Sequence, residues 1–316
     1  MPTQTSSQLF REFKEGERLM GNAFEITVVA DNEEWAKEKI KNAIAEIRRI
    51  EKLLTTFDET SQTNQVNKLA GVAPAKVCRE FFELVARSLK ISRVTDGAFD
   101  ITYGSIDKSL WNFDRSMQFL PTASVAKSMV RLINYRNVLL DEDNCTVMLK
   151  EKGMRIGFGG IGKGYAAEMA KALLVEQGVH SGIVNAAGDL TAWGQQANLK
   201  PWTIGIANPN DANFPFSYLN ITNMAVATSG NYEKFIVING KKYSHTINPK
   251  TGLPVTGIKS VTVITPNAEI ADAMATPITV MGIRAGLELV NQVQNLDCII
   301  IDDNNQIYTS KNIKLQ

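Results

Sequence analysis

The chain has 316 residues, of which 44% are hydrophobic, so it can bury the core of one large domain or of a core with an inserted subdomain. Its 34 basic and 33 acidic residues are spread along the whole length and give a formal net charge of +1. This balance provides neither the basic stripe that nucleic acid requires nor a polybasic membrane patch. We therefore expect no nucleic-acid partner. Because no window reaches the ~18 apolar residues of a spanning helix, we also expect no transmembrane segment.

The cysteines and the first residues exclude two further classes. Cys78, Cys145 and Cys298 are far apart and odd in number, which predicts neither a disulfide framework nor a CxxC metal site, and we expect them to be small buried residues. Residues 1–10 are polar and contain neither the apolar core of a signal sequence nor a cysteine for lipidation. We expect residues 1–13 to be disordered.

The first half of the chain is predicted to be largely helical. Residues 24–29 alternate and are rich in branched side chains, which is typical of a strand. Apolar residues recur at helical spacing from Trp35 to Leu54, which predicts one long helix over residues 33–54. Further helices are expected at residues 61–69 with Ser61 as the cap, at 81–94, and at 123–133, with a sharp turn at 96–102. We predict a helical cap portion over residues 33–135.

The second half is predicted to mix strands and helices. Strands at 138–140 and 146–149 precede a glycine-rich loop, a helix at 166–177 and a strand at 182–185, which reads as a strand, helix, strand unit. The remaining strands are expected at 202–207, 216–221, 224–228, on both sides of a hairpin at 239–240, at 261–264 and at 298–301, with helices at 268–281 and 285–293. This order predicts an α+β fold with a mixed or antiparallel sheet flanked by helices, a single domain over 14–316 whose α/β core spans 136–316.

The glycine-rich loop, residues 156–165, has five glycines and one lysine in ten positions. Such a loop at the start of a helix favours backbone amides that hold a phosphate. It matches G-x-G-x-x-G, but the acidic residue that a dinucleotide fold places about 20 positions on would fall at Gln177 and Gly178. It also matches most of a P-loop, but Gly164 stands where a serine or threonine must bind magnesium. A purely structural turn remains the alternative.

Seven short motifs carry a family resemblance. They are Met20-Gly21, residues 97–102, Leu110-Trp111, residues 160–164, residues 227–232, residues 243–252 and residues 271–276. In this order they resemble the ApbE family of FAD:protein FMN transferases, from about Lys14 to the C-terminal region. The resemblance implies an enzyme that cleaves the pyrophosphate of FAD, releases AMP and attaches FMN through a phosphoester to a threonine or serine of a target flavoprotein. It also implies that Mg²⁺ is required.

The resemblance further implies a metal site. Its ligands would be the side chains of Asp272 and Thr276 with backbone carbonyls of Gly160 and Ala275. Asp272 and Thr276 lie four apart on the predicted helix 268–281 and so share one face. Magnesium prefers hard oxygen ligands and keeps waters and substrate phosphates as partners, so this donor set is sufficient.

Two basic residues complete the catalytic set that the resemblance implies, with Asp272. Lys163 would lie against the pyrophosphate and neutralise the charge that builds as the anhydride breaks. His245, one of two histidines, would contact or orient FAD and is not assigned as the general base. The alternatives are a solvated surface lysine and a histidine with a structural role.

Other matching positions are expected around the flavin or its adenosine half. They are Met20, Asn67, Ala98, Phe99 and Asp100. Asp100 is expected to contact the adenine or the ribose. Core packing explains Met20 and Phe99 equally well.

Four positions depart from the pattern of the family. Phe57 stands where family members often carry a tyrosine that stacks on the isoalloxazine ring, and stacking needs only the aromatic face. Asn22 replaces a threonine, Ala187 replaces the first glycine of Gly-Gly-Asp, and Gly157 replaces an aspartate six residues before the lysine. The loss of the carboxylate at Gly157 removes an FAD contact or a hydrogen bond near the metal.

The same site could serve two other functions, FAD pyrophosphatase activity that yields free FMN and AMP, or FAD binding without chemistry. Intact Asp272, Thr276 and Lys163 argue against a pure binder. Family members are commonly exported and anchored at the outer face of the bacterial inner membrane. The sequence as written predicts a cytoplasmic protein, and a periplasmic or membrane-anchored one if the chain is a trimmed form.

Overall fold

The centre of the molecule is an eight-stranded sheet in which every neighbouring pair is antiparallel. The computed structural model describes residues 10–107, 109, 119–206, 216–230, 235–238 and 240–313. In spatial order the strands are β1 (Arg11–Leu19), β2 (Asn22–Ala30), β6 (Gly182–Ala186), β7 (Asp189–Trp193), β10 (Met224–Gly230), β13 (Ile258–Thr265), β14 (Asp297–Asp302) and β15 (Ile307–Thr309). With its flanking helices, this sheet confirms the predicted α+β fold.

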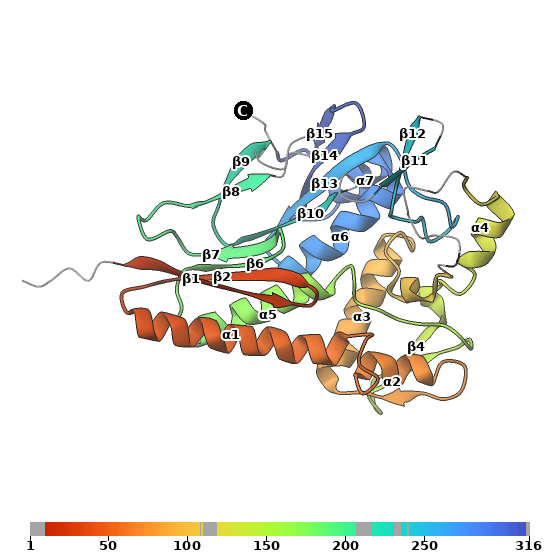
Figure 1. Cartoon of the computed structure of the whole chain (residues 1–316), viewed down its shortest axis with the longest axis horizontal. Coiled ribbons are helices and arrows are strands. Elements are labelled where there is room, and N and C mark those ends of the chain that lie inside the picture. Colours follow the sequence, from red (N-terminus) through yellow and green to blue (C-terminus); the bar gives the residue numbers. More distant parts are fainter. Residues whose placement is uncertain are drawn as a thin grey trace, which may run out of the picture.

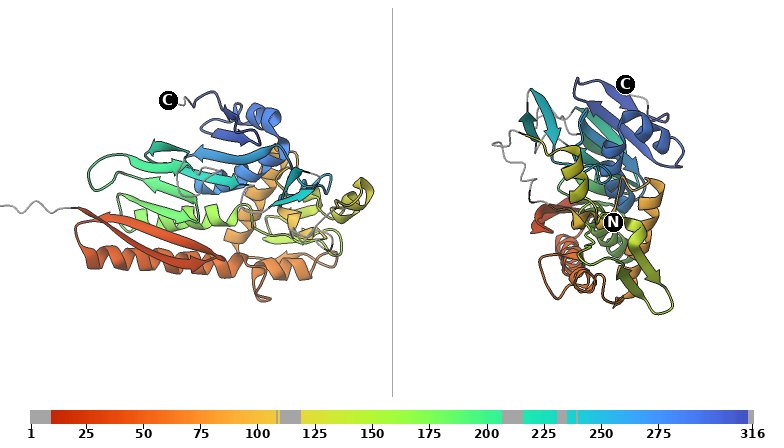
Figure 2. Two further views of the ribbon diagram at one scale, coloured as in Figure 1. Left: turned by 45° about the horizontal axis from the view of Figure 1, so that its top comes forward. Right: turned by 90° about the vertical axis from the view of Figure 1, so that its right-hand side faces the viewer.

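Helices cover one face of this sheet. They are α1 (Glu33–Leu54), α5 (Gly162–Glu176), α6 (Ala268–Met281) and α7 (Ile283–Val290), with α3 (Arg79–Val94) next to α6. Helix α1 runs along β1 and β2 and packs on α5, while α6 packs on β10 and β13 (Figures 1 and 2). The largest buried cluster lies between these helices and the sheet. Helix α1, assigned from the sequence to the helical cap portion, thus also contributes to the main core.

The other face of the sheet carries a second, smaller core. A hairpin of β8 (Trp202–Ile206) and β9 (Ser217–Ile221) packs there. Its Trp202 and Ile221 are buried with Leu190 and Val226 from the sheet. Burial on both faces explains why β7 is buried at all five positions and shows no alternation in its sequence.

Short elements surround the helical end of the molecule. They are α2 (Gln62–Lys68), β3 (Ala75–Lys76), the 3₁₀ turns η1 (Ile101–Ser105) and η2 (Tyr135–Asn137), α4 (Ala123–Met129), β4 (Val138–Asp141), β5 (Thr146–Leu149), β11 (Phe235–Ile238) and β12 (Lys241–Ser244). The predicted strand, helix, strand unit is wrong, because β5 pairs with β3 and β4 in a small sheet. Strand β6 instead pairs with β2 and β7 in the large sheet.

The sequence pattern did not predict the N-terminal strand β1. Residues 11–13, expected to be disordered, pair with β2 as its first part. Six of the nine residues of β1 are charged, which hides the alternation of Phe13 and Leu19 toward the core. Charges of this kind suit a strand at the edge of a sheet, where they discourage pairing with another chain. Residues 1–9 lie outside the described residues.

Several boundaries follow tertiary contacts that the sequence does not reveal. Helices α1 and α6 have the predicted limits, but α5 begins at Gly162, four residues earlier than predicted. Helix α4 ends at Met129 and does not reach Ile133. Of the cysteines, Cys298 is buried as expected, whereas Cys78 is exposed and Cys145 is half-buried. Within the described ranges, none of the helices has the length and apolar character to cross a bilayer.

Candidate active site

A cavity of about 1040 Å³, called here the central cavity, lies where the glycine-rich loop meets the helical end of the molecule. Its walls include Met20, Phe57, Phe99, Lys163, His245 and Thr276. Ala98, Asp100, Gly157 and Gly160 also line it. Segments far apart in the sequence are therefore brought together here, and nine of the twelve predicted site residues face one space.

The glycine-rich loop is anchored by Phe158. Its buried ring meets Phe81 of α3 edge-on, with 5.3 Å between the ring centroids. Its carbonyl accepts hydrogen bonds from the amides of Ile161 (3.2 Å) and Gly162 (2.7 Å), which start α5. Phe158 thus fixes the loop to the hydrophobic core, and residues of the loop line the central cavity.

Helices α5 and α6 touch backbone to backbone at Gly164. A Cβ atom added there would lie 2.1 Å from the carbonyl oxygen of Ala268 and 2.7 Å from Cβ of Asp272. The Gly164 amide donates to Oδ2 of Asp272 at 2.9 Å. The sequence predicted that amides at this helix start hold a phosphate, but this one is occupied by a carboxylate. Only glycine lets α6 come close enough for that bond.

Lys163 lines the cavity and is paired with Asp189, a residue to which the sequence assigned no role. Lys163 Nζ and Asp189 Oδ2 form an ion pair, and Asp189 Oδ1 accepts from the Thr228 amide at 3.1 Å. Asp189 follows a two-residue turn in which Ala187 and Gly188 both have positive φ, 55° and 98°. The turn before Asp189 was the one feature that could have indicated a role for this residue. Such a turn is typical of a tight hairpin, which fixes the direction of the side chain that follows it.

Burial, and after it the negative charge of Asp189, raise the pKa of the Asp272 carboxyl to about 7, and the positive charge of Lys163 opposes this rise. Two buried carboxylates therefore share one lysine. This excess of negative charge is the environment that a bound divalent cation would offset.

The donor set near Asp272 fits Mg²⁺. Thr276 and Gly160 line the central cavity, while Asp272, one turn before Thr276 on α6, is buried and is not among the residues that line it. Ala275 does not line it, and its carbonyl accepts from the Thr279 hydroxyl at 3.2 Å. Among the residues described, no three histidine, cysteine or acidic side chains cluster as a metal site. The oxygens present are of the kind that Mg²⁺ supplements with water and phosphate.

Met20 stands at the tip of the β1–β2 hairpin. Both turn residues have positive φ, 51° at Met20 and 75° at Gly21, which is typical of a type I′ turn. The Met20 amide donates to Oε1 of Glu51 at 2.7 Å, and Nδ2 of Asn22 donates to the Met20 carbonyl at 3.0 Å. Asn22, a departure from the family pattern, therefore fixes the turn that carries Met20.

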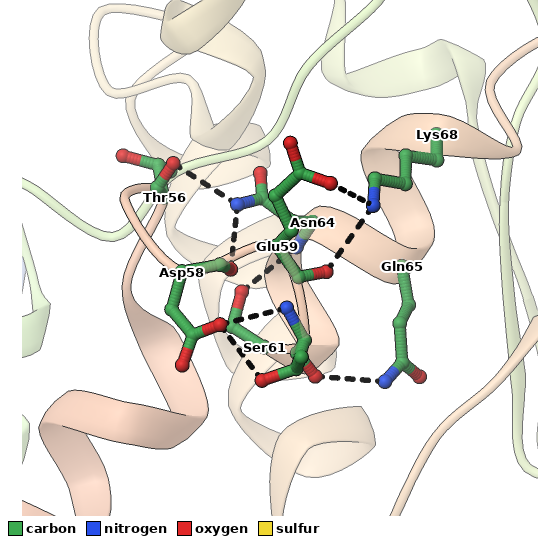
Figure 3. A network of polar contacts seen from close by, with 8 residues as sticks. Thr56, Asp58, Glu59, Ser61, Asn64, Gln65 and Lys68 are labelled. Atoms are coloured by element: carbon green, nitrogen blue, oxygen red, sulfur yellow. Dashed lines mark hydrogen bonds and ion pairs between the residues drawn. The ribbon is translucent and has the colours of Figure 1, made fainter.

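Phe57 is 97% exposed at the mouth of the cavity, on the loop between α1 and α2. Polar contacts hold this loop (Figure 3). Nδ2 of Asn64 donates to the carbonyls of Thr56 (3.0 Å) and Asp58 (2.8 Å), the residues on either side of Phe57. The Ser61 hydroxyl oxygen accepts from the Asn64 amide at 3.1 Å. The ring is thus presented to solvent by a fixed backbone.

Two predicted cofactor contacts have polar groups occupied by the protein. Asp100 lines the cavity, but its carboxylate accepts from the Thr102 amide (2.8 Å) and hydroxyl (2.6 Å) and from the Tyr135 amide (2.9 Å). Burial raises the pKa of Asp100. Asn67 does not line the cavity and exchanges two hydrogen bonds with the Ile156 backbone, at 2.7 and 3.1 Å. Asn67 therefore fixes the entry into the glycine-rich loop.

The segment that carries His245 forms another part of the wall. His245 is exposed and lines the cavity, and the segment is attached through Ile247, whose amide donates to the Tyr103 hydroxyl at 3.3 Å. Beside Gly157, where the family pattern has an aspartate, a Cβ would meet only Thr56 Cγ2 at 4.0 Å. The predicted motif at Leu110-Trp111 lies outside the described residues.

Comparisons with known proteins agree with this geometry. The model of the ApbE family matches residues 20–300. The FAD:protein FMN transferase of Klebsiella pneumoniae strain 342 is 32% identical, with 85% of this chain and 84% of that protein covered. The one of Salmonella typhimurium strain LT2 is 29% identical, with 92% and 84% covered. The crystal structure of the ApbE protein of Thermotoga maritima MSB8 superposes with a TM-score of 0.85 at 28% identity, with 95% and 97% covered. The chain therefore belongs to the ApbE family.

Proposed function

We propose that this protein is a Mg²⁺-dependent FAD:protein FMN transferase. It would transfer FMN from FAD to a threonine or serine hydroxyl of a target flavoprotein and release AMP. Family membership and the names of the relatives support this assignment. The observation that carries it is the central cavity of about 1040 Å³, where Lys163 and Thr276 face the same space as the exposed ring of Phe57. This volume is sufficient for a dinucleotide.

The walls of the cavity suit the two chemically different parts of FAD. Phe57 offers an aromatic face to the isoalloxazine ring, and the half-buried Met20 adds apolar surface near it. Lys163 offers a positive charge to the pyrophosphate at the end of the glycine-rich loop. Asp189 and the Thr228 amide hold that lysine in place, so its charge is preorganised before the substrate arrives.

Asp272, Thr276 and the Gly160 carbonyl would hold the magnesium ion. The ion, when bound, supplies positive charge to the pyrophosphate oxygens. The Gly164 amide donates to Oδ2 of Asp272 at 2.9 Å and so fixes the orientation of this carboxylate. Ala275 remains a prediction as a fourth ligand.

The transfer is a substitution at phosphorus. The acceptor hydroxyl oxygen forms a bond to the phosphorus of the FMN half, and the bond from that phosphorus to the bridging oxygen breaks. The oxygen leaves with AMP, the hydroxyl proton passes to solvent, and nothing is oxidised or reduced. Lys163 stabilises the negative charge that develops on the leaving phosphate. His245, which also lines the cavity, orients FAD.

A labelling assay tests this function. The protein is incubated with FAD, Mg²⁺ and a flavoprotein domain that exposes a threonine, and the products are separated on a denaturing gel. We expect flavin fluorescence in the band of the acceptor. Free FMN and AMP without a labelled band would identify a pyrophosphatase, and intact FAD would identify a binder. Either result would contradict the proposal.

A further inference from the structure

We propose that four side chains that do not line the central cavity set the position of α6 relative to α5, and that Glu269 is a positioning residue for Asp272 and Thr276. The four are Glu80, Arg87, Tyr165 and Glu269, called here the helix brace. The inference rests on the proposed function, because the groups that it positions are the candidate metal ligands.

The brace connects three helices through one face of α3. Arg87 donates two hydrogen bonds to the buried carboxylate of Glu269 on α6, at 2.7 and 2.9 Å. The guanidinium carbon of Arg87 lies 5.6 Å from the ring centroid of Tyr165 on α5. The Tyr165 hydroxyl donates to Oε1 of Glu80 at 2.7 Å. Glu80 and Arg87 are two helical turns apart and share a face, so α3 holds both α5 and α6.

The brace residues on α5 and α6, Tyr165 and Glu269, are close in sequence to residues of the candidate site. Tyr165 follows Gly164, where the two helix backbones touch, and lies two residues after Lys163. Glu269 precedes Asp272 by less than one turn of α6. The close contact at Gly164 fixes the distance between the two helices, and the lateral bonds of the brace would fix the position of α6 along α5. Mutation of a residue that supports metal ligands typically weakens metal affinity by about 10–100-fold, which makes that position matter.

The brace does not have the character of a second ligand site. A cavity of about 640 Å³ is lined by these residues together with Arg49 and Glu83. Its charges are already paired, since Arg49 bonds Glu80 and Glu83 bonds Arg79, in addition to the bond between Arg87 and Glu269. A site for an ionic ligand would present charges without such partners. The pairing instead suits a rigid support.

The test compares Glu269→Gln with a matched control, Glu83→Gln. Glu83 lines the same cavity and accepts from Arg79 at 2.7 Å, but both residues lie on α3, so the control cuts no bond between helices. Mn²⁺ binding is measured by electron paramagnetic resonance with the metal alone. The Mg²⁺ concentration for half-maximal FMN transfer and the melting temperature are measured on the same samples.

We expect Glu269→Gln to raise the Mn²⁺ and Mg²⁺ concentrations for half-saturation about tenfold, as is usual for residues that support metal ligands. Transfer at saturating Mg²⁺ recovers most of the wild-type rate, because the ligands are intact. Glu83→Gln leaves both concentrations unchanged.

Unchanged metal affinity in Glu269→Gln, or an equal loss in Glu83→Gln, would overturn the brace. Arg87→Lys is a milder variant should Glu269→Gln fail to fold, since lysine keeps the charge but not the paired geometry. It should show a smaller shift in the same direction, and wild-type affinity there would also overturn the inference. A wild-type protein that binds no Mn²⁺ and labels no acceptor would instead overturn the proposed function.

Discussion

Two walls of the central cavity are built in opposite ways. The wall of α5 and α6 is fixed by steric contact, with Gly164 so close to Ala268 that no side chain fits between them. The wall of Phe57 is an exposed loop fixed by hydrogen bonds from Asn64 to the backbone on both sides of the ring. The first wall therefore positions charges with little freedom, while the second presents an aromatic face that can adjust to a ligand.

Gly164→Ala should have the largest effect, because it disrupts the steric wall itself. The new methyl group overlaps the Ala268 carbonyl, and overpacking of this severity destabilises by about 3 kcal/mol. Urea denaturation would measure the loss, together with loss of FMN transfer. Gly159→Ala is the control for stability, since its Cβ meets nothing within 4 Å. Equal stability of the two variants would contradict the steric account.

Asp272→Ala should abolish transfer while the protein stays folded. The change removes the candidate metal carboxylate and frees the Gly164 amide, but it leaves the close contact at Gly164 in place. Gel fluorescence measures labelling, and circular dichroism verifies the fold. Undiminished labelling would remove Asp272 from the metal site.

Asn64→Ala should loosen the Phe57 wall without changing the metal wall. It removes both hydrogen bonds of the buried side chain to the carbonyls of Thr56 and Asp58, at a cost of about 1–3 kcal/mol. We expect a higher KM for FAD and an unchanged Mg²⁺ dependence. Gln65→Ala, which cuts one exposed bond to the Thr60 carbonyl, is the control. A shift in Mg²⁺ dependence would show that the two walls are not separate.

Phe57→Ala should have the smallest effect on stability. The ring is 97% exposed, so its removal leaves the melting temperature unchanged. Loss of aromatic stacking, about 0.5–1.5 kcal/mol, should weaken FAD binding several-fold in a fluorescence titration. Phe57→Tyr keeps the aromatic face and should bind like the wild type. Unchanged FAD affinity in Phe57→Ala would exclude stacking at this wall.

The sequence predicted local structure well where the local signal was strong. Helix α1 has both predicted ends because one apolar face and the Asn32 cap define it, and Ser61 caps α2 as expected. Strand β1 was missed because its charges conceal its alternation. The early start of α5 was missed because glycines at a helix start oppose helix propensity, while the hydrogen bonds to the Phe158 carbonyl and the packing on α6 stabilise them there in the folded chain.

The candidate site was predictable only as a set of residue types. The motifs assigned Lys163, Asp272 and Thr276 to one site. They did not identify Asp189, whose contact with the Thr228 amide depends on the pairing of β7 with β10. Asn67 was expected beside the cofactor, and its side chain holds the Ile156 backbone, a role that the motif did not indicate. Which polar groups are already occupied by the protein is a tertiary property, and the motifs alone do not contain it.

The most direct test of the proposed function is the ratio of AMP released to acceptor labelled. Wild-type protein, FAD, Mg²⁺ and the acceptor domain are incubated, AMP is measured by chromatography, and bound FMN by the intact mass of the acceptor. A transferase that uses the central cavity releases one AMP for every acceptor that gains FMN, and Asp272→Ala yields neither product. AMP in the absence of labelled acceptor, or full labelling by Asp272→Ala, would contradict the account.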